Sequence, residues 1–245
     1  MEKQDIQEFR RDLFDAARRV TSIGSGSIGG KASGLAFIND VIRENFNSRQ
    51  FPQIAVNIPS FTVIRTDVFD AFLERNNLID LAYSDASDDI IGHAFQKALL
   101  PAEILGDLRG LIEKVHTPLA VRSSSLLEDA LYQPFAGVYS TKMIPNNHPS
   151  PDARFQKLME AVKLVYASTF LKSAKDYIRA IGRPHRDEKM AVIIQEVVGC
   201  RYADRFYPNV SGVARSYNFY SIGRSRPEDG VASLALGLGK AIVDG

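Results

Sequence analysis

The stretch LAVRSSSLLEDALYQPFAGVYST, residues 119–141, combines a strand pattern with a dense set of polar groups. Its apolar beginning predicts a short strand that ends at Arg122. A planar guanidinium can hold phosphate oxygens in bidentate fashion. The hydroxyls of Ser123 and Ser124 follow at once, and each either donates to a phosphate or caps the turn. The stretch therefore indicates a phosphate site at the end of a strand.

Two acidic residues, Glu128 and Asp129, follow in the same stretch. They either offer oxygen atoms to Mg²⁺ or pair with Arg122, and pairing is the favoured interpretation for Asp129. An arginine at a strand end is by itself more typical of a surface ion pair than of a ligand site. The phosphate interpretation therefore needs support from elsewhere in the chain.

A second stretch, SIGSGSIGGKASGL at residues 22–35, contains five of the seventeen glycines of the chain. It leads into a predicted helix whose first residues include Lys31. A helix N-terminus carries partial positive charge and disfavours a cation, so an anion between the two would remove the conflict. The alternative is a flexible surface loop.

Gly24, Gly26 and Gly29 satisfy the G-x-G-x-x-G pattern of dinucleotide-binding loops. That motif needs a strand before it, whereas residues 5–20 predict a helix. One face of this helix would carry Ile6, Phe9, Leu13, Ala17 and Val20. The dinucleotide motif is therefore disfavoured.

The P-loop pattern also fails to match the glycine-rich stretch. It requires a glycine where this chain has Ser25, and a serine or threonine where it has Ala32. Neither of the two familiar phosphate loops therefore explains the stretch.

Composition is that of an ordinary globular protein, with 45% apolar and 24% charged residues. Lys and Arg total 30 against 29 Asp and Glu, so no overall field favours nucleic acid or a membrane surface, and any phosphate site must be local. The single Cys200 cannot form an internal disulfide. The balanced charge gives no reason to expect a nucleic-acid partner. Because the N-terminus is charged and no long apolar run occurs, we expect no membrane partner and a cytoplasmic setting.

Helical and strand patterns alternate along the chain, which predicts an α/β or α+β fold. Thr66 is the expected N-cap of a helix, and residues 201–210 are expected to form a loop. Further helices are predicted at 31–46, 100–115 and 153–181, and strands at 61–64, 118–125, 189–199, 211–221 and within 230–245.

Taken together, these stretches resemble the N-terminal nucleotide-binding domain of pyruvate phosphate dikinase and phosphoenolpyruvate synthase, which has the ATP-grasp fold. The matching stretches are IGGKASGL, IPSFTVIRTDVFDAFL, AVRSSSLLEDALYQPFAGVYST, VIIQEVVG, SGVA and ALGLGKAIVDG, which span residues 23–245. The resemblance implies an α+β fold with two subdomains around a cleft. It divides the chain into an N-terminal helix or linker (1–20), a first subdomain (21–205) and the start of a truncated second lobe (206–245).

The same resemblance implies which residues hold ATP. Lys31 and Arg122 would contact the triphosphate and stabilise its charge during transfer, so they are the expected catalytic residues. Residues 192–198 would form the hinge against which adenine lies, with Gln195 or Glu196 reaching the base or ribose; the alternative is that both are outward positions of a buried strand. The implied nucleotide-binding set is Gly29, Gly30, Lys31, Arg122, Ser123, Ser124, Gln195, Glu196 and Val197.

The chain departs from the family pattern at three places. Lys240 stands where the synthases usually have an acidic residue, Arg215 replaces a phenylalanine, and the hinge is Gln-Glu-Val-Val instead of Gln-x-Met-Val. A lysine near a magnesium–triphosphate site would reverse a charge, so either Lys240 lies outside the metal shell or metal-dependent turnover is altered. The metal ligands therefore stay open.

Family members use ATP and Mg²⁺ to phosphorylate a histidine on a swivelling domain, which passes the group to pyruvate at a C-terminal barrel. Both domains are expected in a longer protein, because His93, His116, His148 and His185 lack the family's phospho-histidine setting and are expected to be solvated or structural. The expected function is therefore the ATP-binding domain of such a phosphotransferase. Two alternatives are a non-catalytic nucleotide-sensing or regulatory module and a dikinase-like phosphorylation of glucan or water.

Overall fold

The computed structural model divides the chain into two units, Met1–Val197 and Val198–Gly245. The residues that the structure describes are 6–12, 20–47, 49–125, 137–182, 188–239 and 242.

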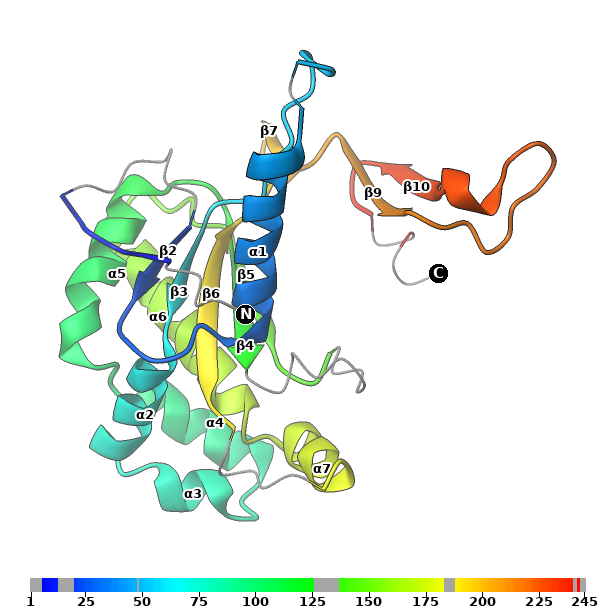
Figure 1. The fold of residues 1–245 in the computed structure, drawn as a ribbon. Helices are drawn as coiled ribbons and strands as arrows, with labels where there is room; N and C mark the ends of the chain where they lie inside the picture. The colour runs from blue at the N-terminus through cyan, green and yellow to red at the C-terminus, as the bar shows by residue number, and fades with distance from the viewer. Residues whose placement is uncertain are drawn as a thin grey trace. The chain divides into compact units, whose positions relative to one another are not determined.

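Among the described residues, a six-stranded mixed sheet forms the centre of the first unit (Figure 1). Its strands are β1 (Gln7–Glu8), β2 (Val20–Ile23), β3 (Phe61–Ile64), β4 (Leu119–Ser125), β5 (Thr141–Ile144) and β6 (Met190–Glu196). The order is β1-β2-β3-β6-β4-β5, in which the β1/β2 and β2/β3 pairs are parallel and the others antiparallel. The strand predicted at 189–199 is confirmed as β6, which is central and buried from Met190 to Gln195.

Helices cover both faces of this sheet, because its central strands are apolar on both sides. On one face, α1 (Gly29–Asn45) packs Ala32 against Phe61 and Ile193 of the sheet. The larger core lies on the other face, where it includes Ile64 and Val192. The helices of that face are α2 (Thr66–Arg75), α3 (Ile79–Tyr83), α4 (Asp88–Lys97), α5 (Ala102–Lys114), α6 (Pro151–Ser168) and α7 (Lys172–Ala180).

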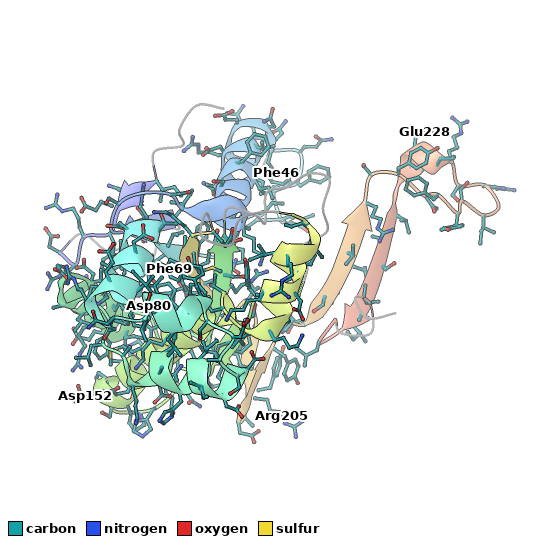
Figure 2. The ribbon with its side chains drawn as sticks, turned by 90° about the horizontal axis from the view of Figure 1, so that it is seen from below. Phe46, Phe69, Asp80, Asp152, Arg205 and Glu228 are labelled. Atoms are coloured by element: carbon teal, nitrogen blue, oxygen red, sulfur yellow. The ribbon has the colours of Figure 1, made fainter. Side chains whose placement is uncertain are left out.

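Aromatic rings fill the centre of the larger core. Phe69, labelled in Figure 2, lies 5.1 Å from Tyr166 and 5.9 Å from Phe170, measured between ring centroids. All three residues are fully buried, and burial raises the pKa of the Tyr166 hydroxyl above its ordinary value. These contacts join α2 to α6 and so hold the turn before α2 against the rest of the unit.

The helix predicted over residues 5–20 is wrong where the structure describes it. β1 occupies Gln7–Glu8, and Val20 begins β2. The apolar spacing fits a helix, but Thr21 is buried and its Oγ1 lies 2.9 Å from Oγ1 of Thr62 on the neighbouring strand. Pairing between distant segments therefore overrides the local periodicity.

Two further local predictions are corrected. The helix predicted at 153–181 is two helices, α6 and α7, separated where Phe170 enters the aromatic core. Thr66 is the first residue of α2, and the N-cap is Arg65 instead. The hydroxyl of Thr66 accepts a hydrogen bond from the backbone N–H of Ser27.

The described part of the second unit contains two hairpins. The first pairs β7 (Cys200–Tyr202) with β8 (Arg205–Tyr207), and the second pairs β9 (Val210–Arg215) with β10 (Val231–Leu236); a 3₁₀ turn, η3 (Pro227–Asp229), lies between β9 and β10. The two strands predicted in the tail are found as β9 and β10, but the first ends at Arg215 and not at residue 221. The loop predicted at 201–210 is instead the first hairpin, whose turn holds Ala203 at a φ of 56°. None of residues 198–239 is buried, and Figure 2 labels Arg205 and Glu228 among the projecting side chains.

Among the helices that the structure describes, none has the length and apolar character to cross a membrane.

Candidate functional site

The glycine-rich segment forms a tight loop between β2 and α1. Gly24, Gly26 and Gly29 have φ angles of 86°, 85° and 69°, a region that disfavours residues with a Cβ. Because β2 precedes the loop and pairs in parallel with β3, the loop belongs to a β-α-β unit. The sequence-based argument against a dinucleotide loop, which assumed a helix before the glycines, is therefore wrong. What distinguishes this sheet from a doubly wound parallel one is the antiparallel β6 beside β3.

The start of α1 lies directly on the end of β4. A Cβ added to Gly29 would lie 1.7 Å from the carbonyl oxygen of Ser124, so only glycine fits there. The Ser124 hydroxyl donates to the Ile28 carbonyl at 2.8 Å and accepts from the Ala32 N–H at 3.0 Å. Ser124 therefore joins the strand to the first turn of the helix, which is a structural role.

Lys31 is a half-buried residue of that first turn, and its side chain reaches β4. Its Nζ donates to the hydroxyl of Ser123 at 3.1 Å, across 92 positions of sequence. The hydroxyl of Ser123 is fully buried, as is that of Ser124. The first turn of α1 has no acidic residue, and its N-terminal end carries the partial positive charge of the helix dipole.

Arg122 lies in the middle of β4, which continues to Ser125, so the prediction that the strand ends at Arg122 is wrong. It is in register with Ile193, which packs on the α1 face of the sheet. Its Nη1 donates to Oε1 of Gln195 at 3.1 Å. Gln195 is 7% exposed and pairs in register with Ala120, two residues along the strands from the pair Arg122 and Ile193 and therefore on the same face. The structure thus places the Lys31 side chain in contact with Ser123, the residue after Arg122, and the Arg122 side chain in contact with Gln195.

Glu196 and Val197 are placed differently from Gln195. Glu196 accepts a hydrogen bond from the Thr117 hydroxyl at 2.6 Å, and its backbone N–H donates to the Ser60 carbonyl. The Val197 N–H donates to the Pro118 carbonyl at 2.9 Å. A base that contacts Val197 would therefore meet its carbonyl oxygen rather than its N–H.

Several residues singled out in the sequence lie outside the described part of the chain, namely Glu128, Asp129, His185 and Lys240. Arg215 is exposed at the end of β9, in register with Val231. His93, His116 and His148 are exposed. Within the described ranges, no group of three or more His, Cys, Asp or Glu residues is arranged to hold a metal ion.

The turn after β3 supplies side chains to the site that the sequence patterns did not indicate. Arg65, Thr66 and Asp67 bond to the glycine loop and to the strand before it. These contacts join residues 39 to 43 positions apart, so no local spacing marks them.

A comparison with protein families matches residues 25–245 to the family described as pyruvate phosphate dikinase, AMP/ATP-binding domain. The match includes the glycine loop from Ser25 onward, β4 and β6, which supply the contacts of Lys31 and Arg122 described above. The chain therefore belongs to the AMP/ATP-binding domain family of pyruvate phosphate dikinase.

Proposed function

We propose that this chain binds the triphosphate of ATP between the first turn of α1 and the end of β4. In the full-length protein, the bound ATP would phosphorylate a carrier histidine on a swivelling domain, which passes the group to a pyruvate-binding domain. The observation that carries the proposal is the bond from Lys31 Nζ to Ser123 Oγ, beside Arg122. It brings the cation of α1 to Ser123, the neighbour of Arg122 on β4, from a segment 92 positions away in sequence.

The first turn of α1 supports this placement of phosphate. The N–H groups of a first helical turn lack acceptors within the helix and can point toward an anion. In α1 the N–H groups of Gly29 and Ala32 already donate to the hydroxyls of Ser27 and Ser124, so the proposal concerns the N–H groups between them. Gly30 has no side chain between these groups and a ligand. A triphosphate at this position would also relieve the repulsion between the two cations and the positive helix end.

The base is proposed to lie on the Gln195 side of the site. Arg122 holds Oε1 of Gln195, which leaves the amide nitrogen of Gln195 as a donor for the base or ribose. The Val197 carbonyl is a neighbouring acceptor for an exocyclic amino group. Glu196 is occupied by Thr117, so we assign recognition to Gln195 rather than Glu196.

Phosphoryl transfer asks a protein mainly for positioning and for stabilisation of charge on the phosphate oxygens. Lys31 would bind the phosphate oxygens from the helix side and Arg122 from the strand side. The several N–H donors of the guanidinium can stabilise the negative charge that develops on the leaving group during transfer. Among the residues that the structure describes, the groups that we assign to these steps are Lys31, Arg122 and the backbone of the first turn of α1.

Calorimetric titration of the 245-residue chain with ATP, with and without Mg²⁺, tests this function. We expect ATP to bind at least about 100-fold more tightly than adenosine, because charge-assisted contacts to the phosphates contribute roughly 1.5–3 kcal/mol each. Equal affinity for ATP and adenosine would contradict the phosphate site. ATP binding that Mg²⁺ does not strengthen would instead favour the nucleotide-sensing alternative.

A further inference from the structure

Thr66 is bonded to the glycine loop through both its side chain and its backbone. Its Oγ1 accepts from the Ser27 N–H at 3.0 Å, and its own N–H donates to the Ser27 carbonyl at 3.1 Å. Thr66 is only 4% exposed. A Cβ at Gly26 would lie 2.7 Å from Oγ1 of Thr66, so the loop approaches as closely as a glycine allows.

Asp67 holds the preceding part of the loop in a similar way. Its Oδ2 accepts from the Ser25 hydroxyl at 2.9 Å, and its N–H donates to the Ser25 carbonyl at 3.3 Å. A Cβ at Gly24 would lie 2.6 Å from Oδ1 of Asp67. Gly24 and Gly26 are thus required by the side chains of this turn as well as by their φ angles.

Arg65 completes the set of contacts. Its Nε donates to the hydroxyl of Ser22, which is 2% exposed, and its Nη1 donates to the Gly26 carbonyl at 3.2 Å. Three successive residues therefore bond to the loop or to the strand that leads into it.

The contacts continue into the proposed phosphate site. Ser27, which Thr66 holds, accepts through its Oγ a hydrogen bond from the N–H of Gly29 at 3.1 Å. Gly29 begins α1, and Lys31 lies two residues further on. Two hydrogen bonds thus connect the Thr66 side chain to the start of the helix that carries the lysine.

We propose that Arg65, Thr66 and Asp67 are positioning residues for the triphosphate, a role that rests on the ATP-binding function proposed above. Gly24, Ser25 and Gly26 are exposed, and an exposed glycine–serine loop without such bonds would be mobile. Fixing it beforehand removes an ordering cost that phosphate binding would otherwise carry. This gain in affinity is expected for ligands that carry phosphates and not for adenosine, which has none.

Thr66→Val tests the proposal, because it keeps the shape of the side chain and removes the acceptor for Ser27. Thr66→Ser restores the acceptor and should restore binding. Thr62→Val is the matched control, since Thr62 is equally buried on β3 and its hydroxyl bonds to Thr21 instead of the loop. The full chain is titrated with ATP, with inorganic tripolyphosphate and with adenosine, and its thermal unfolding is followed.

Thr66→Val is expected to lose about tenfold in affinity for ATP and for tripolyphosphate, the effect of leaving one buried donor unpaired. Adenosine should bind as it does to the wild type. Equal losses for all three ligands, equal losses in Thr62→Val, or ATP affinity within about twofold of the wild type would each overturn the positioning role.

A second variant covers the case in which Thr66→Val does not fold. Ser25→Ala changes an exposed side chain and removes only the bond to Asp67, so a loss of about threefold confined to ATP and tripolyphosphate is expected. Unchanged affinity for both would contradict the proposal. Failure of the wild type itself to bind ATP would instead refute the proposed function, so the two failures are distinguishable.

Discussion

At the level of single residues, Lys31 is the most informative position, because its side chain connects α1 to β4. Lys31→Ala should weaken ATP binding by about 10- to 100-fold, since a bond to a charged group contributes roughly 1.5–3 kcal/mol. The midpoint of thermal unfolding should change little, because Lys31 is only half-buried. Titration calorimetry measures the first quantity and circular dichroism the second. Lys142→Ala, at an exposed position of β5, is the control and should bind ATP as the wild type does.

Arg154 shows a cation used for stability instead. Its Nη1 donates to the carbonyls of Ile112 and Val115 at 2.7 and 3.0 Å, at the end of α5, and the residue is 4% exposed. Arg154→Met should lower the free energy of unfolding by about 2–4 kcal/mol, because the buried Ile112 carbonyl loses its charged donor while the Val115 carbonyl keeps only its bond from Asn146. Urea unfolding measures this loss. The exposed Lys157→Met on the same helix should cost less than about 0.5 kcal/mol, and an equal cost at both positions would contradict the capping role.

At the level of elements, the contact between α1 and β4 requires a glycine at position 29 of α1 but not at position 34. Gly29→Ala should destabilise the protein by about 3 kcal/mol or more, because its Cβ would meet the Ser124 backbone and its φ is positive. Gly34→Ala, in the same helix, has open space around the new methyl group and should raise the free energy of unfolding by about 0.5–1 kcal/mol. Urea unfolding of both variants tests the contact. Similar effects at the two positions would contradict it.

Some elements could be predicted from the sequence because their signals are local. β3 and β6 are apolar runs that mark buried strands, and β4 begins with one. β2 could not be predicted, because its buried Thr21 depends on a partner from β3. β1 and β5 were missed because short edge strands are defined by pairing and not by their own composition.

The candidate site divides in the same way. Arg122 and the glycines were recognisable because they combine strand-end and turn patterns with a family resemblance. The approach of Gly29 to Ser124 and the bonds from residues 65–67 join distant segments, so only the fold shows them. Their roles toward ATP remain predictions.

At the scale of the whole molecule, the described apolar cores belong to the first unit. Every buried member of both clusters lies between Phe9 and Ile194. A fragment that ends at Val197 should therefore keep a cooperative thermal transition within about 3 °C of that of the full chain. Circular dichroism during heating measures the transition. A fragment that is unfolded, or that melts more than about 10 °C lower, would show that the second unit is needed for the fold of the first.

The central claim is that Lys31 and Arg122 hold one triphosphate at the junction of α1 and β4. The most direct test is the ATP affinity of Arg122→Glu, measured by calorimetry beside Arg43→Glu, which reverses an exposed charge at the far end of α1. The account predicts that Arg122→Glu loses detectable ATP binding while its circular dichroism spectrum is kept, and that Arg43→Glu binds normally. Wild-type affinity for ATP in a folded Arg122→Glu protein would contradict it.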